Sequence, residues 1–358
     1  MIQKSKNKYF SLRNFLIISL SLSILGCNNI GEPLSQEFTD SEWLIDEEFI
    51  RQGCFGGLDC IPSLDNPKFS PINGSDLEFL DDNDLVIGIW DGTQYIAYPH
   101  PLLDWHEIAN HNSYAVSYCP LTGSALHFST EGDFGVSGLL YNSNLIMYDR
   151  STTSFWPQMF LGSASGDRQG EALALQPLLE TNYGNWKKLF PASIVANSNT
   201  GYNRNYRLYP YGSYKTCNSN SCADYLYFPV NGVDDRLPAK TRVLTVIAEN
   251  EADAYPIQSI LVPTVFKGNI GNRQYSAFIS GPDNIAIAFW TDRSFNVHTW
   301  DIKTGTILLQ DTESGSLWNI FGHAVDGPAA GSKLTAADAY IAFWFSVAAF
   351  NSNVELRQ

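Results

Sequence analysis

Apolar and polar residues along this chain follow the pattern of short β-strands and turns. Runs rich in Val, Ile, Tyr, Phe and Thr are separated by Gly, Asn, Asp and Pro. The segment Val86–Pro99 predicts a hairpin with Asp91 and Gly92 in its turn. Further strands are expected in the segments YAVSYCP, SALHFST, LIMYDR, RVLTVIAE, QYSAFIS and NIAIAFW.

Three segments have the apolar spacing of helices, namely residues 101–110, 183–191 and 336–350. In the first of them, His106 and Asn110 lie four residues apart. We therefore expect these two side chains to share one face of a helix.

The chain also contains an internal repeat. Val86–Pro99 (VIGIWDGTQYIAYP) matches Val243–Pro256 (VLTVIAENEADAYP), and DRSTTSFW recurs later as DTESGSLW, each followed by three Gly and a Leu. Two matches in the same order indicate a duplication. The second half lacks the DWHE and YCPL segments of the first, so we expect the chemistry to lie in the first half.

These patterns predict a mainly β (α+β) fold made of two internally repeated β-rich units with short decorating helices. The first unit is expected over residues 55–197 and the second over residues 241–358. A segment rich in Tyr and Asn, residues 198–240, would link them. A binding site would lie between the units or in one of them.

The N-terminus predicts export. Basic residues precede a short apolar run that ends in ILGC, which is the pattern of a lipoprotein signal peptide over residues 1–26. Cys27 would carry the lipid, and residues 27–54 would form a tether. Asn28 after the cysteine favours the outer membrane. We expect a lipid-anchored protein of the cell envelope, on the periplasmic face or the surface; an ordinary cleaved signal peptide is the alternative.

Composition narrows the class of protein. The 358 residues include 37 acidic and 22 basic side chains, a formal net charge of −15, which argues against nucleic-acid binding. Hydrophobic residues make up 44% and aromatic residues 13%, so the chain can build a core and is not generally disordered. The expected partner is the membrane, through Cys27, and no nucleic acid.

The six cysteines suggest two short-range disulfides. Cys54 pairs most simply with Cys60, and Cys217 with Cys222, because each pair brackets a flexible polar turn in an exported chain. With Cys27 assigned to lipid, Cys119 remains as an unpaired thiol. Such a thiol in an oxidising compartment is either buried or used.

Six longer motifs occur in the order IPSLDNPKF, VIGI…AYP, DWHEIAN, YCPLTGSALHF, GVSGLLYNSNLIMYDRSTTSFW and DDRLPAK. Together they resemble the prokaryotic family called domain of unknown function 3179, over roughly residues 55–355. The resemblance implies no established activity. Many members read Cys-Pro-Leu-Cys where this chain ends the motif with Thr122, so a redox pair with Cys119 lacks its second thiol.

The first candidate site is a transition-metal site. His106, Cys119 and His127 offer the soft ligands that copper, zinc or iron prefer, and Glu107 or Asn110 would complete or orient the set as ligand-binding residues. The alternative is structural, with the imidazoles bonding to backbone and Cys119 filling core space.

Two other functions remain open. In a thiol enzyme, Cys119 would attack, His106 would act as the base, and Glu107 or Asn110 would orient the imidazole. In a non-catalytic envelope binding or scaffold module, Cys119 would be buried and inert.

The Gly- and Asn-rich motif offers further candidate ligand contacts at Tyr141, Asn144 and Arg150. The alternative for this motif is again structural. Gly and Asn commonly build turns, and Arg150 beside an aspartate would brace the fold.

Overall fold

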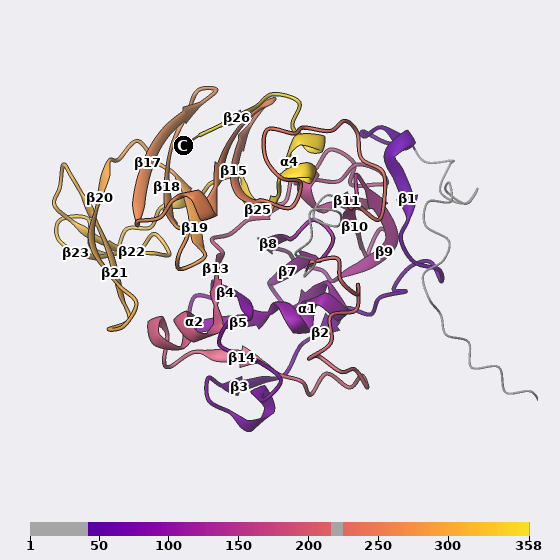
Figure 1. The fold of residues 1–358 in the computed structure, drawn as a ribbon, viewed down its shortest axis with the longest axis horizontal. Coiled ribbons are helices and arrows are strands. Elements are labelled where there is room, and N and C mark those ends of the chain that lie inside the picture. Colours follow the sequence, from indigo (N-terminus) through magenta and orange to yellow (C-terminus); the bar gives the residue numbers. More distant parts are fainter. Residues whose placement is uncertain (1–41, 216–224, 358) are drawn as a thin grey trace, which may run out of the picture. The chain divides into compact units, whose positions relative to one another are not determined.

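The computed structural model describes residues 42–215 and 225–357. Within them the chain forms six β-sheets and three short α-helices, so the expected mainly β fold is confirmed (Figure 1). The helices are α1 (His100–His106), α2 (Tyr183–Leu189) and α4 (Trp344–Phe350). Short 3-10 turns occur as η2 (Glu47–Phe49), η3 (Ser75–Leu77), η4 (Gln158–Phe160) and η5 (Ile257–Ser259).

Three sheets make up the first unit. Their strands, in spatial order, are β13 (Leu179–Asn182), β4 (Leu85–Trp90), β5 (Tyr95–Pro99), β14 (Ile194–Ala196) and β3 (Phe69–Pro71); β12 (Ala174–Leu175), β8 (Ser124–Ser129), β7 (Tyr114–Cys119), β6 (Ile108–Asn110) and β2 (Leu64–Asp65); and β1 (Ile50–Gln52), β9 (Phe134–Tyr141), β10 (Asn144–Asp149) and β11 (Phe155–Pro157).

Three sheets in the same order make up the second unit. They are β25 (Ala339–Phe343), β15 (Arg242–Ala248), β16 (Glu251–Pro256) and β26 (Val354–Leu356); β17 (Thr264–Ile270), β18 (Arg273–Ser280), β19 (Ile285–Trp290) and β24 (Thr335–Ala336); and β20 (Phe295–Asp301), β21 (Thr306–Asp311), β22 (Leu317–Asn319) and β23 (Ala324–Asp326).

The duplication extends to the register of the strands. Val86 pairs with Pro99 between β4 and β5, and Val243 pairs with Pro256 between β15 and β16. In both units the next strand of the sheet, β14 or β26, runs parallel to its neighbour β5 or β16 and follows a short helix. The prediction of two repeated β-rich units is therefore confirmed.

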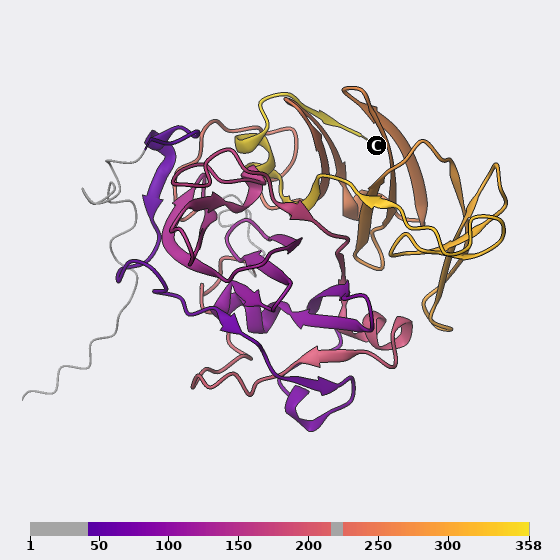
Figure 2. The same ribbon diagram turned by 180° about the vertical axis from the view of Figure 1, so that it is seen from behind.

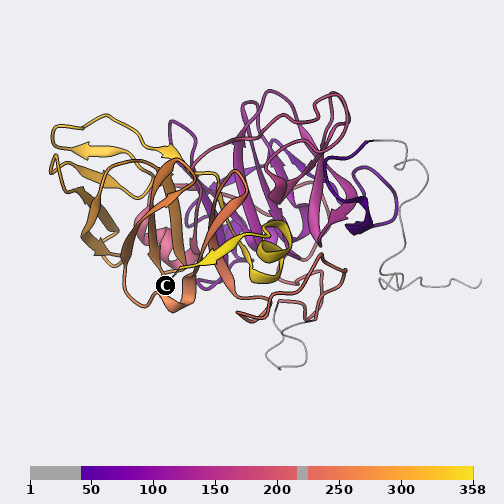
Figure 3. The ribbon, with the colours of Figure 1, turned by 90° about the horizontal axis from the view of Figure 1, so that it is seen from above.

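The two units dock on each other reciprocally. Strand β8 of the first unit lies against β25 of the second, and β19 lies against β13 in the equivalent arrangement. Two hydrogen bonds join the units in the same reciprocal way. The Phe343 N–H of the second unit donates to the Thr122 carbonyl of the first (2.7 Å), and the Thr181 hydroxyl of the first donates to the Asp283 carbonyl of the second (2.7 Å). The units are therefore related by a pseudo-twofold axis. They lie side by side seen from behind (Figure 2) and from above (Figure 3).

Helix α2 shows how the sequence sets local structure. The Asn182 side chain caps its N-terminus by accepting a bond from the Asn185 N–H, and the Trp186 ring is fully buried. That ring lies directly over Gly88 of β4, where any Cβ would overlap it. Gly88 is therefore required for the helix to pack on the sheet.

Two of the expected helices differ from the structure. Helix α1 ends at His106 because Glu107 has a φ of 57°, after which β6 begins. His106 and Asn110 therefore lie on a helix and a strand, and the prediction that they share a helix face is wrong. Residues 339–343 of the third segment are strand β25, since they pair with β15, and only Trp344–Phe350 is helical.

The Cys54–Cys60 disulfide is present as predicted. Cys27, the signal peptide, and Cys217 with Cys222 lie outside the described residues. Part of the expected tether belongs to the fold, because Trp43 and Ile45 are buried and β1 pairs with β9. Among the described residues, no helix is both long and apolar enough to cross a membrane.

Candidate functional site

His106 is held between two protein groups. Its ring is fully buried, with Nδ1 2.8 Å from the Pro62 carbonyl oxygen and Nε2 2.8 Å from the Tyr206 hydroxyl. Burial lowers the pKa of His106 to about 4, so the imidazole is neutral at pH 7. Both ring nitrogens are therefore already hydrogen-bonded, and these bonds attach α1 to the loops that contain Pro62 and Tyr206.

Cys119 ends strand β7 and is buried. Its sulfur accepts a bond from the Leu145 N–H (3.4 Å) and lies 3.8 Å from the Ser143 carbonyl oxygen. Burial, with the nearby Glu107 carboxyl, raises the pKa of the Cys119 thiol to about 11. At neutral pH this side chain is a thiol, which is a weak nucleophile.

Glu107 is the ionisable group that most affects the pKa of Cys119. Its carboxylate accepts a bond from the Tyr211 hydroxyl (2.7 Å), and its carbonyl accepts one from the Tyr118 N–H (2.7 Å). Burial raises the pKa of Glu107 to about 7. Glu107, whose carboxyl is bonded to Tyr211, contributes to the raised pKa of Cys119, whereas His106 does not.

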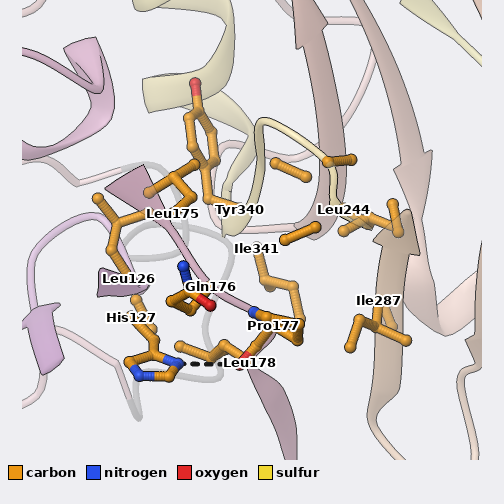
Figure 4. Close-up of a pocket in the computed structure, with 16 residues that line it drawn as sticks. Leu126, His127, Leu175, Gln176, Pro177, Leu178, Leu244, Ile287, Tyr340 and Ile341 are labelled. Atoms are coloured by element: carbon orange, nitrogen blue, oxygen red, sulfur yellow. Dashed lines mark hydrogen bonds between the residues drawn. The ribbon is translucent and has the colours of Figure 1, made fainter. Parts of the chain in front are cut away.

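His127 lies at the junction of the two units. Its Nδ1 is 3.0 Å from the Pro177 carbonyl oxygen, and burial lowers its pKa to about 4. Residues of both units line a cavity of about 40 Å³ beside this ring. Figure 4 shows His127 together with Leu244 and Ile341 of the second unit, which also line the cavity. That volume holds only a few water molecules.

His106, Cys119 and His127 thus have separate sets of partners. No three His, Cys, Asp or Glu side chains among residues 42–215 and 225–357 are grouped so that they could hold a metal ion. The metal site at these three residues stays a prediction that the arrangement of the described side chains does not support.

Asn110 and Arg150 act together on one loop. The Asn110 amide donates to Asp65 (2.7 Å), and the Arg150 guanidinium donates to Asp65 (2.7 Å), Asp59 (3.1 Å) and Ser63 (2.9 Å). These bonds attach the segment from Asp59 to Asp65 to the strands of the first unit. Their geometry favours the structural alternative for both residues.

Asn144 and Tyr141 also have structural surroundings. The Asn144 amide lies in a fully buried network with Thr122, Ser124 and Gln158, at 2.9, 3.1 and 3.0 Å. This network holds the turn after Cys119 in place. The Tyr141 ring packs edge-on against Phe350 of the second unit.

A larger hollow, of about 860 Å³, is lined by residues of the first unit alone. Its wall includes Asp149, whose carboxylate already receives bonds from Trp156, Ser151 and Thr152. Arg168 covers the Trp156 ring at 4.7 Å. The Asp149 carboxylate and the Arg168 guanidinium, which also donates to Glu171, are therefore already engaged within the chain.

Sequence reasoning missed a buried cluster of charged side chains. In it, Arg242 of β15 donates to Glu180 of β13 (2.8 Å), and His100 Nε2 lies 2.9 Å from the same carboxylate. Beside it, Lys215 donates to Asp104 of α1 (2.5 Å). We call these five residues the ionic cluster. They come from both units and the linking segment, so no local sequence signal could have found them.

The chain matches the model of a family described as a protein of unknown function (DUF3179), over residues 58–354. It belongs to that family. The resemblance read from the motifs is thereby confirmed. Searches of the curated proteins and of the solved structures each gave no match.

The second unit of this DUF3179 chain builds the same fold with neutral residues at the positions equivalent to His100, Cys119 and Glu180. Ile257 follows Pro256 where His100 follows Pro99, and Ser280 ends β18 where Cys119 ends β7. The first unit therefore carries ionisable side chains at positions where the fold itself accepts neutral ones.

The same comparison applies to the central ion pair. Glu180 pairs with Ile87 on β4, whereas Ile341 pairs with Leu244 at the equivalent place on β15. Arg242 itself begins β15, where the first unit has Leu85 at the start of β4. Neither charge is needed to form these strands.

The buried thiol gives a first testable prediction. Cys119 is buried and its pKa is about 11. At pH 8, we therefore expect an aromatic disulfide reagent to modify this thiol at least about a hundredfold more slowly in the folded protein than in the urea-unfolded protein. The Cys119→Ser variant provides the background rate, since serine occupies the equivalent position of the second unit. Equal rates in the folded and unfolded protein would contradict the buried, inert thiol.

Proposed function

We propose that this protein is a lipid-anchored envelope protein that binds a small polar ligand, without catalysis, at the ionic cluster. The observation that carries the proposal is the difference between the two units. Burying charges is unfavourable unless they are fully paired, and the second unit shows that the fold can form with Ile at the equivalents of His100 and Glu180.

Three buried atoms of the ionic cluster make no hydrogen bond within the described part of the chain, namely Glu180 Oε1, Arg242 Nη1 and His100 Nε2. The last of them lies 2.9 Å from Glu180 Oε2 without the geometry of a hydrogen bond. Glu180 is 0% exposed, so bulk water does not reach it. Buried polar atoms are almost always paired, so these unpaired atoms support a role for the cluster beyond folding.

The linking segment covers the ionic cluster and the Cys119 turn. Besides the Lys215–Asp104 bond, the Tyr214 hydroxyl donates to the Leu121 carbonyl (3.0 Å), and the Tyr211 hydroxyl donates to Glu107. This cover supports binding in an enclosed place over catalysis at an open one. The thiol, with its raised pKa, supports the same choice.

The location in the envelope rests on the sequence. The basic start, the apolar run and the ILGC motif support cleavage before Cys27 and lipid attachment there, and Asn28 supports the outer membrane. In the mature protein, we expect the first tryptic peptide to carry the lipid on Cys27. A Cys27→Ser variant that is processed and membrane-bound like the parent would contradict the anchor.

The binding proposal is tested on the full chain, made with its own signal sequence and extracted from its membrane with detergent. Heat-released small molecules are identified by mass spectrometry, in the parent and in the Glu180→Ile/Arg242→Leu double variant. We expect one compound near a 1:1 ratio in the parent and little in the variant. No compound, or equal amounts in both proteins, would contradict the proposal. Metal analysis of the same samples tests the prediction of copper, zinc or iron.

A further inference from the structure

The large hollow of the first unit, of about 860 Å³, is lined by the turn between β8 and β9 and the turn between β10 and β11. Gly132 belongs to the first of these turns, and Asp149 ends β10 just before the second. Ser129 and Glu131 in the wall are exposed, so the hollow is open to solvent. Its volume lies in the range of about 300–1,000 Å³ that is typical of small-molecule sites.

The turn between β8 and β9 has an equivalent in the second unit, between β19 and β20. The Gly132 N–H donates to the Thr130 hydroxyl (3.1 Å), and the Arg293 N–H donates to the Thr291 hydroxyl (3.1 Å). The two turns therefore have the same bonding, and Gly132 stands where the second unit has Arg293.

Arg293 shows what this place can hold. Its guanidinium donates to the Asp311 carboxylate (2.5 Å) and lies 5.5 Å from the centre of the Trp318 ring. Asp311 is fully buried, so a guanidinium at this place reaches a carboxylate that bulk water does not reach. The second unit thus fills the place with a cation of its own.

The first unit has no side chain at this place. A Cβ added to Gly132 would meet no atom within 4 Å, and Gly132 lines the large hollow. The space that the Arg293 side chain fills in the second unit is therefore open in the first, where it forms part of the hollow.

Asp149 is the equivalent of Asp311, because each ends its strand and begins one of the repeated motifs DRSTTSFW and DTESGSLW. The bonds that Asp149 accepts come from neutral donors, namely Trp156, Ser151 and Thr152. Burial raises the pKa of Asp149, but these bonds lower it more and hold it below its ordinary value, so the carboxylate is charged at pH 7. Since Asp311 accepts the Arg293 guanidinium in addition to neutral donors of the same kinds, Asp149 can accept a cation as well.

The charges around the hollow favour a cation. Asp149 and the exposed Glu131 place two carboxylates in its wall. Arg168 lies over the Trp156 ring at 4.7 Å, but its guanidinium donates twice to Glu171 (3.0 and 2.7 Å), so its charge is already matched. A wall in which negative charge exceeds positive charge attracts cations and repels anions.

We infer that the large hollow binds a small organic cation through a guanidinium group, which takes the place of the Arg293 side chain and faces Asp149. A guanidinium is planar, stays charged at neutral pH and donates several bonds at once, which suits pairing with a carboxylate. The hollow shares no residue with the ionic cluster, so this inference goes beyond the proposed function and does not rest on it.

Two probes of the same length test the inference on the purified full chain, namely agmatine and N-carbamoylputrescine. Both carry an ammonium group at one end, and they differ in that the charged guanidinium of agmatine is replaced by a neutral urea group. By calorimetric titration at pH 7, we expect one equivalent of agmatine to bind, at least about tenfold more tightly than N-carbamoylputrescine. Equal binding of the two probes would overturn the inference.

Variants of Gly132 locate the binding. Gly132 does not have a positive φ, so other residues fit its backbone. Gly132→Arg fills the hollow as Arg293 fills its equivalent and should abolish the binding of agmatine, whereas Gly132→Ala adds only a Cβ and should leave it unchanged. If Gly132→Arg does not fold, Asp149→Asn, which keeps the shape of the side chain, should weaken agmatine at least about tenfold.

The remaining outcomes separate this inference from the proposed function. The Glu180→Ile/Arg242→Leu protein should bind agmatine like the parent, and a loss of binding in it, with Gly132→Arg unaffected, would overturn the inference. Binding of several equivalents that Gly132→Arg does not change would reflect attraction to the acidic surface and would also overturn it. If agmatine does not bind at all, the hollow is not a guanidinium site, while a compound released from the ionic cluster would still support the proposed function.

Discussion

Replacing Glu180 with isoleucine should lower the free energy of unfolding by about 3–5 kcal/mol. The substitution leaves the Arg242 guanidinium, 15% exposed, without its carboxylate in a place that water does not reach freely. Urea unfolding at pH 7, followed by tryptophan fluorescence, measures the change. The loss of stability would come from an unpaired buried charge and not from a cavity, because an isoleucine, Ile341, occupies the equivalent position in the second unit.

The double variant Glu180→Ile/Arg242→Leu should recover most of that loss, because both charges are then gone together. Leu85 and Ile341 show that the two hairpins accept these residues. The exposed pair Arg168–Glu171 serves as the matched control, and Glu171→Ala should cost less than about 1 kcal/mol. A double variant as unstable as the single one would mean that the ion pair is required for folding.

Acid should destabilise the protein through its buried histidines. His106 and His127 have folded pKa values of about 4 against an ordinary 6.5, so below pH 6.5 the unfolded chain takes up protons that the folded chain does not. Each contribution to stability is complete above pH 6.5 and is lost as the pH falls towards 4, up to about 3 kcal/mol per histidine. The partly buried His111 acts in the same direction.

Glu107 opposes this trend. Its folded pKa of about 7 lies above the ordinary 4.5, so its contribution is complete below pH 4.5 and is lost as the pH rises to 7. The His127→Asn variant keeps a donor for the Pro177 carbonyl and cannot titrate, so between pH 7 and 5 it should lose about 2 kcal/mol less than the parent. Glu107→Gln should lose more than the parent. Equal losses in the three proteins, by urea unfolding, would contradict these assignments.

The parts of the fold that follow local rules could be predicted from the sequence. The β4–β5 hairpin was expected from its Asp91-Gly92 turn, where the Asp91 carboxylate accepts the Thr93 and Gln94 N–H groups. The helix at Tyr183 was expected from its spacing. Repeated motifs were enough to predict two units with one architecture, because equal sequences impose equal registers.

The candidate site could not be predicted in the same way. The prediction that His106 and Asn110 share a helix face is wrong because Glu107 between them adopts a positive φ. A positive φ is expected from the sequence mainly at Gly or Asn, so a Glu gives no warning of it. The ionic cluster depends on strands β13 and β15, which belong to different units, and on a lysine in the linking segment. Its members meet only once the units have docked, so no motif contains them.

The reciprocal docking of the units also determines how the chain responds to a break. The turn after Cys119 is bonded to Phe343, and the turn at Asp283 is bonded to Thr181, so each half completes the other's core. If a protease cut the linking segment, the two fragments should stay associated through the contacts between β8 and β25 and between β13 and β19. Separately expressed halves should each be insoluble and should reassemble only when they refold in one another's presence. The covalent link between the halves would then serve mainly to keep their concentrations equal.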